Sequence, residues 1–130
     1  MCERGLSNGD VLRMRVAKAP SLLHHYGIVI CYAGRAMVAH CPAGSTPVLE
    51  PFADFMQGRE WEVNFGRQTD AGPVQLIERF NQLAHREYDL AAFNCEDFVN
   101  RMAGTTYVAG KGFIWAAFVL TVAILLFLID

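Results

Sequence analysis

The sequence predicts an α+β fold in which an antiparallel sheet packs on helices, followed by a C-terminal transmembrane helix. Apolar and polar residues alternate as in strands through the first half of the chain, and apolar residues at helical spacing follow in the second half. The last part of the chain is almost entirely apolar. With 130 residues, the chain is long enough for one domain and too short for two of ordinary size. We therefore expect one domain over residues 1–107 and a membrane anchor over residues 108–130.

The composition argues against two classes of protein. The formal net charge is −2 and the eleven Lys and Arg residues are scattered, so the chain lacks the basic surface that binds nucleic acid. The four cysteines, at positions 2, 31, 41 and 95, have neither the dense spacing of a disulfide scaffold nor a CxxC pair. The N-terminus has no apolar segment typical of a secretory signal. We expect these cysteines to be reduced thiols in the cytoplasm.

Several segments have the patterns of strands. In "GDVLRMRV", residues 9–16, apolar side chains alternate with arginines. Residues 26–32 form a nearly continuous apolar run, and "RAMVAH" follows after Gly34, which predicts a hairpin with its turn at the glycine. Shorter strands are expected at residues 48–49 and in "EWEVNF", residues 60–65.

An amphipathic helix is predicted after these strands. Its apolar residues recur at helical spacing from Pro73 to about His85. Proline suits the first turn of a helix, and Asp70 lies upstream as a candidate cap. We expect this helix to pack against the sheet.

A second helix is predicted from Asn94 to Met102 or Ala103. Asparagine is a favourable N-cap residue, and Asp97 stands where a carboxylate reaches back toward the cap. Gly104 follows, and glycine is common just beyond the end of a helix.

The C-terminal segment "FIWAAFVLTVAILLFLI", residues 113–129, is predicted to cross a membrane. Its length of roughly 26 Å as a helix is near the lower limit for a hydrocarbon core of about 30 Å. The alternative is a buried core helix, but so small a domain has no interior that surrounds a helix on every side. Lys111 and Arg101 precede the segment and only Asp130 follows it, which favours a cytoplasmic domain.

Cys95 is the predicted first residue of the second helix and the candidate nucleophile. Unsatisfied backbone N–H groups and the helix dipole favour a thiolate at this position. The same N–H groups are placed to stabilise an oxyanion. Glu96 and Asp97 oppose the thiolate because a neighbouring negative charge raises the pKa of a thiol. A base is therefore needed.

Two histidines are candidates for this chemistry. The midpoint of His25 and His40 falls between Tyr32 and Ala33, close to the predicted turn. Folding the hairpin should therefore bring the two imidazoles together. One can accept the thiol proton while the other orients it, as in a catalytic triad. The predicted catalytic residues are thus Cys95, His25 and His40.

The remaining cysteines have simpler explanations. We expect Cys2, Cys31 and Cys41 to be inert thiols, because free cysteine packs as a small hydrophobic residue. A zinc site built from His40, Cys41 and Cys95 is conceivable, but the usual ligand spacing is absent.

The motifs together resemble one known family. "GDVL" at residues 9–12, "HYGIVI" at residues 25–30 with a second histidine at position 40, and "YDLAAFNCEDFVN" at residues 88–100 occur in this order. This pattern resembles the lecithin:retinol acyltransferase-like (LRAT domain) family, which includes the HRAS-like suppressor phospholipases and acyltransferases. The resemblance runs from about Gly9 to Gly104 and extends to a hydrophobic C-terminal anchor.

The resemblance implies both a fold and an activity. The fold would be that of a circularly permuted papain-like thiol hydrolase. Cys95 would match the nucleophile, His25 the base and His40 the orienting histidine. Such enzymes take an acyl chain from a membrane glycerophospholipid as a thioester and pass it to water, an amine or an alcohol. No metal or other cofactor is implied, and the partners would be the lipid substrate, the acyl acceptor and the bilayer.

Two departures from the family pattern bear on these residues. The family commonly has a histidine where Asp97 stands, which adds negative charge near Cys95. The separation of 15 residues between His25 and His40 is a few residues longer than in that family. Two other functions stay open: a thiol peptidase or amidase, and a non-catalytic membrane-bound adaptor that keeps these motifs for folding.

Overall fold

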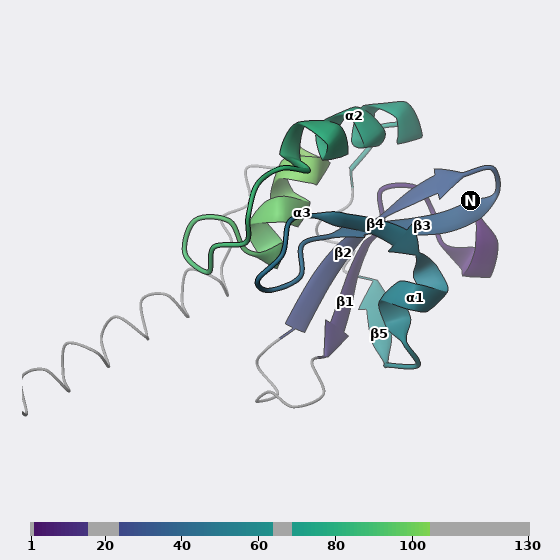
Figure 1. Ribbon diagram of the computed structural model, residues 1–130. Coiled ribbons are helices and arrows are strands. Elements are labelled where there is room, and N and C mark those ends of the chain that lie inside the picture. The colour runs from purple at the N-terminus through teal and green to yellow at the C-terminus, as the bar shows by residue number, and fades with distance from the viewer. Residues whose placement is uncertain (1, 16–23, 64–68, 105–130) are drawn as a thin grey trace, which may run out of the picture.

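The computed structural model describes residues 2–15, 24–63 and 69–104 (Figure 1). Five strands form one sheet in the order β4-β3-β2-β1-β5, and every neighbouring pair is antiparallel. The strands are β1 (Val11–Arg15), β2 (His24–Tyr32), β3 (Arg35–His40), β4 (Val48–Pro51) and β5 (Trp61–Val63). The predicted α+β class with an antiparallel sheet and helices is confirmed.

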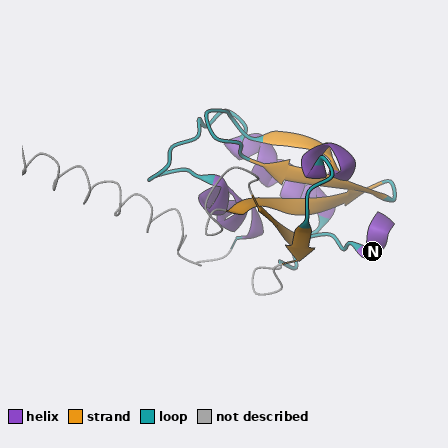
Figure 2. Cartoon of the chain, turned by 90° about the horizontal axis from the view of Figure 1, so that it is seen from below, coloured by secondary structure: helices purple, strands orange, loops and turns teal. Residues whose placement is uncertain are grey.

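Helices cover both faces of the sheet. They are α1 (Phe52–Met56), α2 (Pro73–Leu83) and α3 (Cys95–Ala103), with a 3-10 helix η1 (Glu3–Gly5) at the N-terminal end. Helices α2 and α3 lie on one side and α1 on the other (Figure 1). Figure 2 shows the helices and the sheet from below.

Two buried clusters result from this arrangement. The α3-side cluster includes Val11, Tyr26, Ile28, Leu76, Phe93, Phe98 and Val99. The α1-side cluster includes Leu6, Leu12, Met14, Val29, Val38, Phe52, Phe55 and Met56. Successive residues of one strand enter opposite clusters because side chains alternate across a sheet.

The β2–β3 hairpin turns at Ala33 and Gly34, as predicted. Their φ angles of 51° and 78° are both positive, which is typical of the two-residue turn that matches strand twist. The turn sets the register of the whole hairpin, with Tyr32 opposite Arg35 and Gly27 opposite His40.

Helix α2 begins at the predicted proline, but Asp70 is not its cap. The cap position is Gly72, because Pro73 takes the first helical position and so fixes the residue before it as the cap. Glycine has no side chain to contribute, and its backbone N–H instead donates to Oε1 of Gln75 at 3.2 Å.

Helix α3 has the predicted caps at both ends. Oδ1 of Asn94 accepts from the backbone N–H of Asp97 at 2.9 Å, and Oδ2 of Asp97 accepts from the N–H of Asn94 at 3.3 Å. Gly104 ends the helix with a φ of 71°. Cys95 is therefore the first helical residue, as expected.

The expectation of reduced thiols is wrong for Cys2 and Cys31. These two residues form a disulfide with a Cα–Cα distance of 5.7 Å. Glu3 joins the two segments beside this bond: its N–H donates to the carbonyl of Gly34 at 3.2 Å, and its Oε1 accepts from the N–H of Ala36 at 2.8 Å. These bonds hold the N-terminal segment against the tip of the β2–β3 hairpin, which is about thirty residues away in the sequence.

Some predicted segments lie partly or wholly outside the described residues. These are residue 16 at the end of the first strand, residues 64–65 of the strand that contains β5, and residues 105–107 of the domain together with the anchor over residues 108–130. Within the described ranges, no helix has the length and apolar character needed to span a bilayer. The anchor therefore stays a prediction.

Candidate active site

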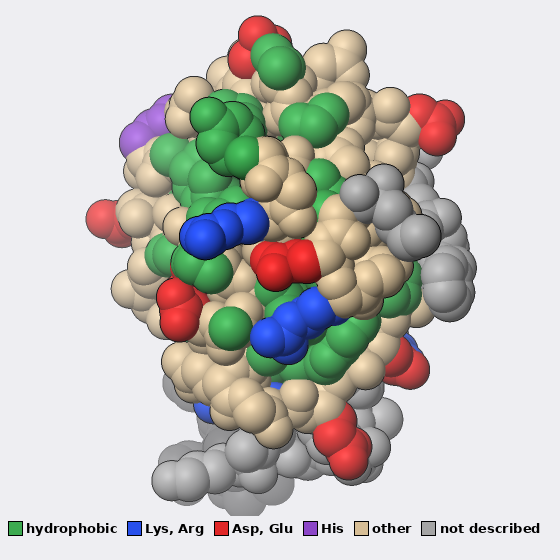
Figure 3. Space-filling view, turned by 90° about the vertical axis from the view of Figure 1, so that its right-hand side faces the viewer, with side chains coloured by type: hydrophobic (Ala, Val, Ile, Leu, Met, Phe, Trp, Pro, Cys, Tyr) green, Lys and Arg blue, Asp and Glu red, His purple; other side chains and the backbone are tan. Residues whose placement is uncertain are grey.

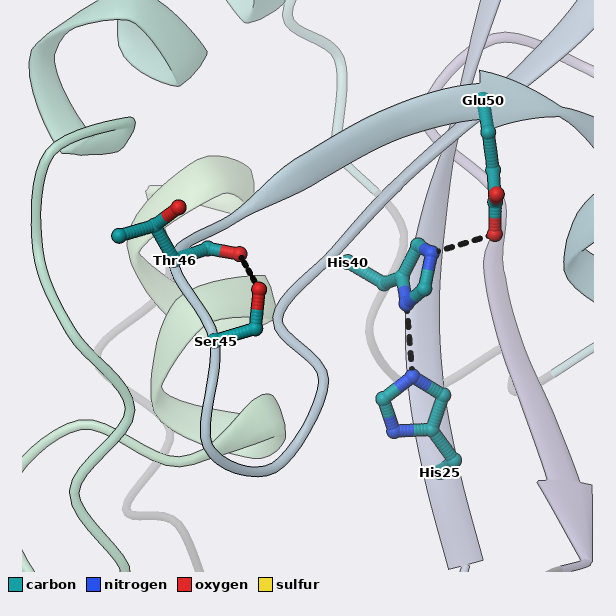
Figure 4. Close-up of polar contacts among 5 residues, drawn as sticks. All are labelled: His25, His40, Ser45, Thr46 and Glu50. Atoms are coloured by element: carbon teal, nitrogen blue, oxygen red, sulfur yellow. Dashed lines mark hydrogen bonds and ion pairs between the residues drawn. The ribbon is translucent and has the colours of Figure 1, made fainter.

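His25 and His40 lie side by side on the sheet. Gly27 pairs with His40, so His25, two residues earlier on β2, lies diagonally opposite on the same face, within reach of a long side chain. Nε2 of His25 is 2.8 Å from Nδ1 of His40 (Figure 4). The predicted proximity of the two imidazoles is confirmed.

Glu50 extends this pair into a row of three side chains. Strand β4 pairs with β3 so that Glu50 is opposite Val38, which places it on the same face as His40. Its Oε1 is 2.7 Å from Nε2 of His40 (Figure 4). Sequence reasoning missed Glu50, because a strand was expected at residues 48–49 but the pattern could not show which strand it pairs with.

Hydrogen-bond chemistry gives the row a direction. A carboxylate that is ionised only accepts, which would require Nε2 of His40 to carry the proton of the hydrogen bond to Glu50. Nδ1 of neutral His40 then accepts from the Nε2–H of His25. This leaves Nδ1 of His25 unprotonated on the ring edge turned away from His40 (Figure 4).

Both histidines are neutral at physiological pH. Burial lowers the pKa of His25 to about 3, with help from the charges of His40 and Arg59. Burial also lowers the pKa of His40, against an opposing effect of its hydrogen bond and charge interaction with Glu50. His25 is therefore unprotonated, but a pKa this far below neutral also makes it a weak base.

Phe55 forms an aromatic wall beside the pair. Its ring centroid lies 5.7 Å from that of His25 and 4.8 Å from that of His40. Gly27 makes this approach possible, because a Cβ at that position would lie 3.1 Å from the Phe55 ring.

Cys95 lies at the N-terminus of α3, where its sulfur interacts with the backbone of Tyr26, the residue after His25. Burial raises the pKa of Cys95, and the Glu96 carboxylate raises it further. Backbone hydrogen bonds from Tyr26, Glu96 and Cys95 itself act in the opposite direction. The helix start therefore favours the thiolate as predicted, but burial outweighs it.

The thiol and the imidazoles belong to different faces of the sheet. Cys95 packs against the α3-side cluster, whereas His25 and His40 contact Phe55 of the α1-side cluster. Neither histidine is among the groups that shift the pKa of Cys95. The structure thus brings the two histidines together on one face. It places the thiol beside the main chain of β2, the strand that carries His25.

Cys41 and Tyr88 lie near the Cys95 thiol. Burial raises the pKa of Cys41 to about 11 and that of Tyr88 to about 12, and the Cys95 charge contributes to both. Cys41 is a free, fully buried thiol, as expected. The N–H of Tyr88 donates to the carbonyl of Ser45 at 2.9 Å and so joins the two loops beside the thiols. Tyr88 belongs to a motif noted in the sequence, but its nearness to Cys95 was not foreseen.

A cavity of about 420 Å³ opens beside the histidines. Met14, Val48 and Phe55 provide apolar walls, and Arg59 is a cationic group in the lining. Cys95 is not among the lining residues.

No group of three or more His, Cys, Asp or Glu side chains suited to a metal ion occurs in the described part of the chain. The described residues therefore give no support to a zinc site built from His40, Cys41 and Cys95.

The sequence matches no protein-family model, and no curated protein resembles it at a significant level. The resemblance to the lecithin:retinol acyltransferase-like family therefore stays a prediction that depends on the motifs.

Proposed function

We propose that this protein is a membrane-anchored cysteine acyltransferase or phospholipase A type acylhydrolase that acts on glycerophospholipids through an acyl-cysteine thioester. Its domain would have the circularly permuted papain-like fold of the lecithin:retinol acyltransferase-like family. An antiparallel sheet with a cysteine at a helix N-terminus is compatible with that fold.

One observation carries the proposal. The Cys95 sulfur interacts with the backbone of Tyr26, and the preceding residue, His25, is hydrogen-bonded to His40 at 2.8 Å. A thiol next to a strand that carries a neutral, oriented imidazole has the components of a thiol acyltransferase.

The first half-reaction would form the thioester. Nδ1 of His25 would take the proton from Sγ of Cys95, which requires the two groups to meet although the resting structure holds them on different faces of the sheet. The thiolate would then attack the ester carbonyl carbon of the lipid. Backbone N–H groups at the start of α3 stabilise the oxyanion. The intermediate then collapses, the C–O bond breaks, and the leaving alkoxide of the lysophospholipid receives the proton from His25.

The second half-reaction would release the acyl chain. Water, an amine or an alcohol gives a proton to His25 while its oxygen or nitrogen attacks the thioester carbonyl. The C–S bond breaks, and the Cys95 thiolate recovers the proton. Two side chains thereby carry the proton through the whole cycle.

The test is acyl release from phosphatidylcholine vesicles by the detergent-solubilised full chain. We expect Cys95→Ala to lose the activity with its circular dichroism spectrum unchanged. Cys41→Ala is the matched control, because it removes a neighbouring buried thiol, and it should retain the activity. Equal activity in Cys95→Ala and wild type would remove the assigned nucleophile.

The proposed location is a membrane, with residues 113–129 as a single-pass anchor and the domain on the cytoplasmic side. On the face in Figure 3, acidic and basic side chains are interspersed. This mixture of charges argues against a nucleic-acid partner on that face.

The Cys2–Cys31 disulfide helps to decide on which side of the membrane the domain lies, because such bonds persist in oxidising compartments. The bond in this structure therefore counts against the cytoplasmic side. Thiol alkylation in intact cells tests this, because a cytoplasmic domain predicts that the pair is reduced. A bonded pair would place the domain on the other side.

A non-catalytic adaptor is the second candidate. It is favoured by the burial that raises the pKa of Cys95 and by the separation of the thiol and the imidazoles on different faces. An adaptor predicts that the reactivity of Cys95 toward iodoacetamide does not change in His25→Ala. An activated thiol predicts at least a severalfold loss of reactivity in that variant.

A further inference from the structure

Glu50 is the outermost member of the row formed with His40 and His25. Its Oε1 is 2.7 Å from Nε2 of His40, and the side chains of His40 and Glu50 are 9% and 29% exposed. Glu50 comes from a separate strand and belongs to none of the motifs noted in the sequence. Its role therefore has to be argued from the geometry.

The row determines where protons reside. For Nδ1 of His25 to accept a proton, Nε2 of the same ring must carry the hydrogen. That requires Nδ1 of His40 to be the acceptor and Nε2 of His40 to be the donor. A carboxylate enforces this arrangement because it can only accept. Without it, His40 can donate from Nδ1 instead, and the proton of His25 then moves to Nδ1 and blocks it.

The same carboxylate compensates charge. When His25 takes a proton, the pair becomes cationic in a largely buried site, which burial disfavours. Arg59, from the segment after α1, disfavours it further. Glu50, from β4, is the anionic group hydrogen-bonded to the pair. An acidic residue behind a histidine base has this effect in catalytic triads.

We propose that Glu50 is a positioning residue whose carboxylate fixes the tautomer of His40 and so makes Nδ1 of His25 the proton acceptor. The inference rests on the proposed function for its role in catalysis. The tautomers themselves are a property of the resting protein and can be measured without turnover.

The direct test is ¹⁵N NMR of the full chain in detergent micelles, with the histidine rings labelled. In the wild type we expect both His25 and His40 to carry hydrogen at Nε2. In Glu50→Gln we expect mixed tautomers at both rings, because a glutamine amide can donate as well as accept. Glu60→Gln is the control, since Glu60 is an exposed carboxylate, and it should match the wild type. A wild-type His25 protonated at Nδ1, or unchanged tautomers in Glu50→Gln, would overturn the proposal.

Kinetics give an independent measurement. Glu50→Gln should slow acyl-cysteine formation by about 10- to 100-fold, and Glu50→Asp should recover part of the rate. The acid limb of the pH profile should move to lower pH in Glu50→Gln, because the carboxylate stabilises the protonated pair. A rate and profile equal to those of Glu60→Gln would refute positioning while leaving the proposed function intact. If the tautomers change in Glu50→Gln but the wild type forms no acyl adduct, the positioning role of Glu50 is supported and the proposed function is refuted.

Discussion

At the scale of single residues, the burial of His25 has a measurable effect on stability. Its pKa is about 3 in the folded chain, against about 6.5 in the unfolded chain. Below pH 6.5 the unfolded chain takes up a proton that the folded chain refuses. The contribution of this neutral histidine to stability is therefore complete above pH 6.5 and is lost as the pH falls toward 3.

We predict that the free energy of unfolding falls by about 2 kcal/mol between pH 6.5 and pH 5.0 because of this group. Urea unfolding of the full chain in mild detergent at several pH values measures it. His25→Gln removes the titrating ring and should give a flatter profile. Equal slopes in the variant and the wild type would show that His25 titrates normally.

Gly27 controls the wall behind the two histidines. A Cβ at this position would lie 2.5 Å from Cγ1 of Val38 as well as 3.1 Å from the Phe55 ring. We predict that Gly27→Ala lowers stability by about 1–3 kcal/mol, because overpacking displaces neighbours in a dense core. Gly72→Ala is the comparison, since nothing lies within 4 Å of its Cβ position, and it should cost only the preference for glycine over alanine at the N-cap of α2. Equal unfolding midpoints for the two variants would contradict this packing.

The residues of the candidate site differ in how far sequence could predict them. His25 and His40 were paired correctly because a two-residue hairpin turn fixes the register between them. Glu50 was missed because its place depends on the order of strands, which local alternation does not encode. The Cys2–Cys31 bond was missed because it depends on the N-terminal 3-10 turn, which has no periodic signal.

At the scale of elements, the capping box of α3 positions Cys95. Because the side chains of Asn94 and Asp97 bond to each other's backbone N–H groups, the helix starts at the residue after Asn94. Two of the N–H groups near the sulfur, those of Cys95 and Glu96, depend on that start. The long helices and the hairpin could be predicted because caps, turns and periodicity all occur in the sequence. Helix α1 could not, because its five residues are too few for helical periodicity.

We predict that Asn94→Ala lowers the free energy of unfolding by about 1–2 kcal/mol, as expected for loss of an N-cap. Urea unfolding again measures the change. Asn81→Ala, at an exposed position within α2, is the matched control and should cost little or nothing. A loss of the same size at both positions would mean that the cap does not hold the helix start.

At the scale of the whole molecule, helices on both sides bury a small sheet, and the proposed anchor lies beyond the described domain. A chain that ends at Gly110 lacks the apolar segment at residues 113–129. We predict that it remains in the supernatant after ultracentrifugation, whereas the full chain sediments with membranes and resists a carbonate wash. A shortened chain that still sediments with membranes would contradict the anchor.

The central claim is that Cys95 carries an acyl group. Intact-protein mass spectrometry tests it after the detergent-solubilised full chain is incubated with phosphatidylcholine or phosphatidylethanolamine. We predict an added mass of one acyl chain that hydroxylamine removes and that is absent in Cys95→Ala. If no adduct forms in the wild type and His25→Ala leaves the iodoacetamide reactivity of Cys95 unchanged, the thiol is not activated and the acyltransferase account is wrong.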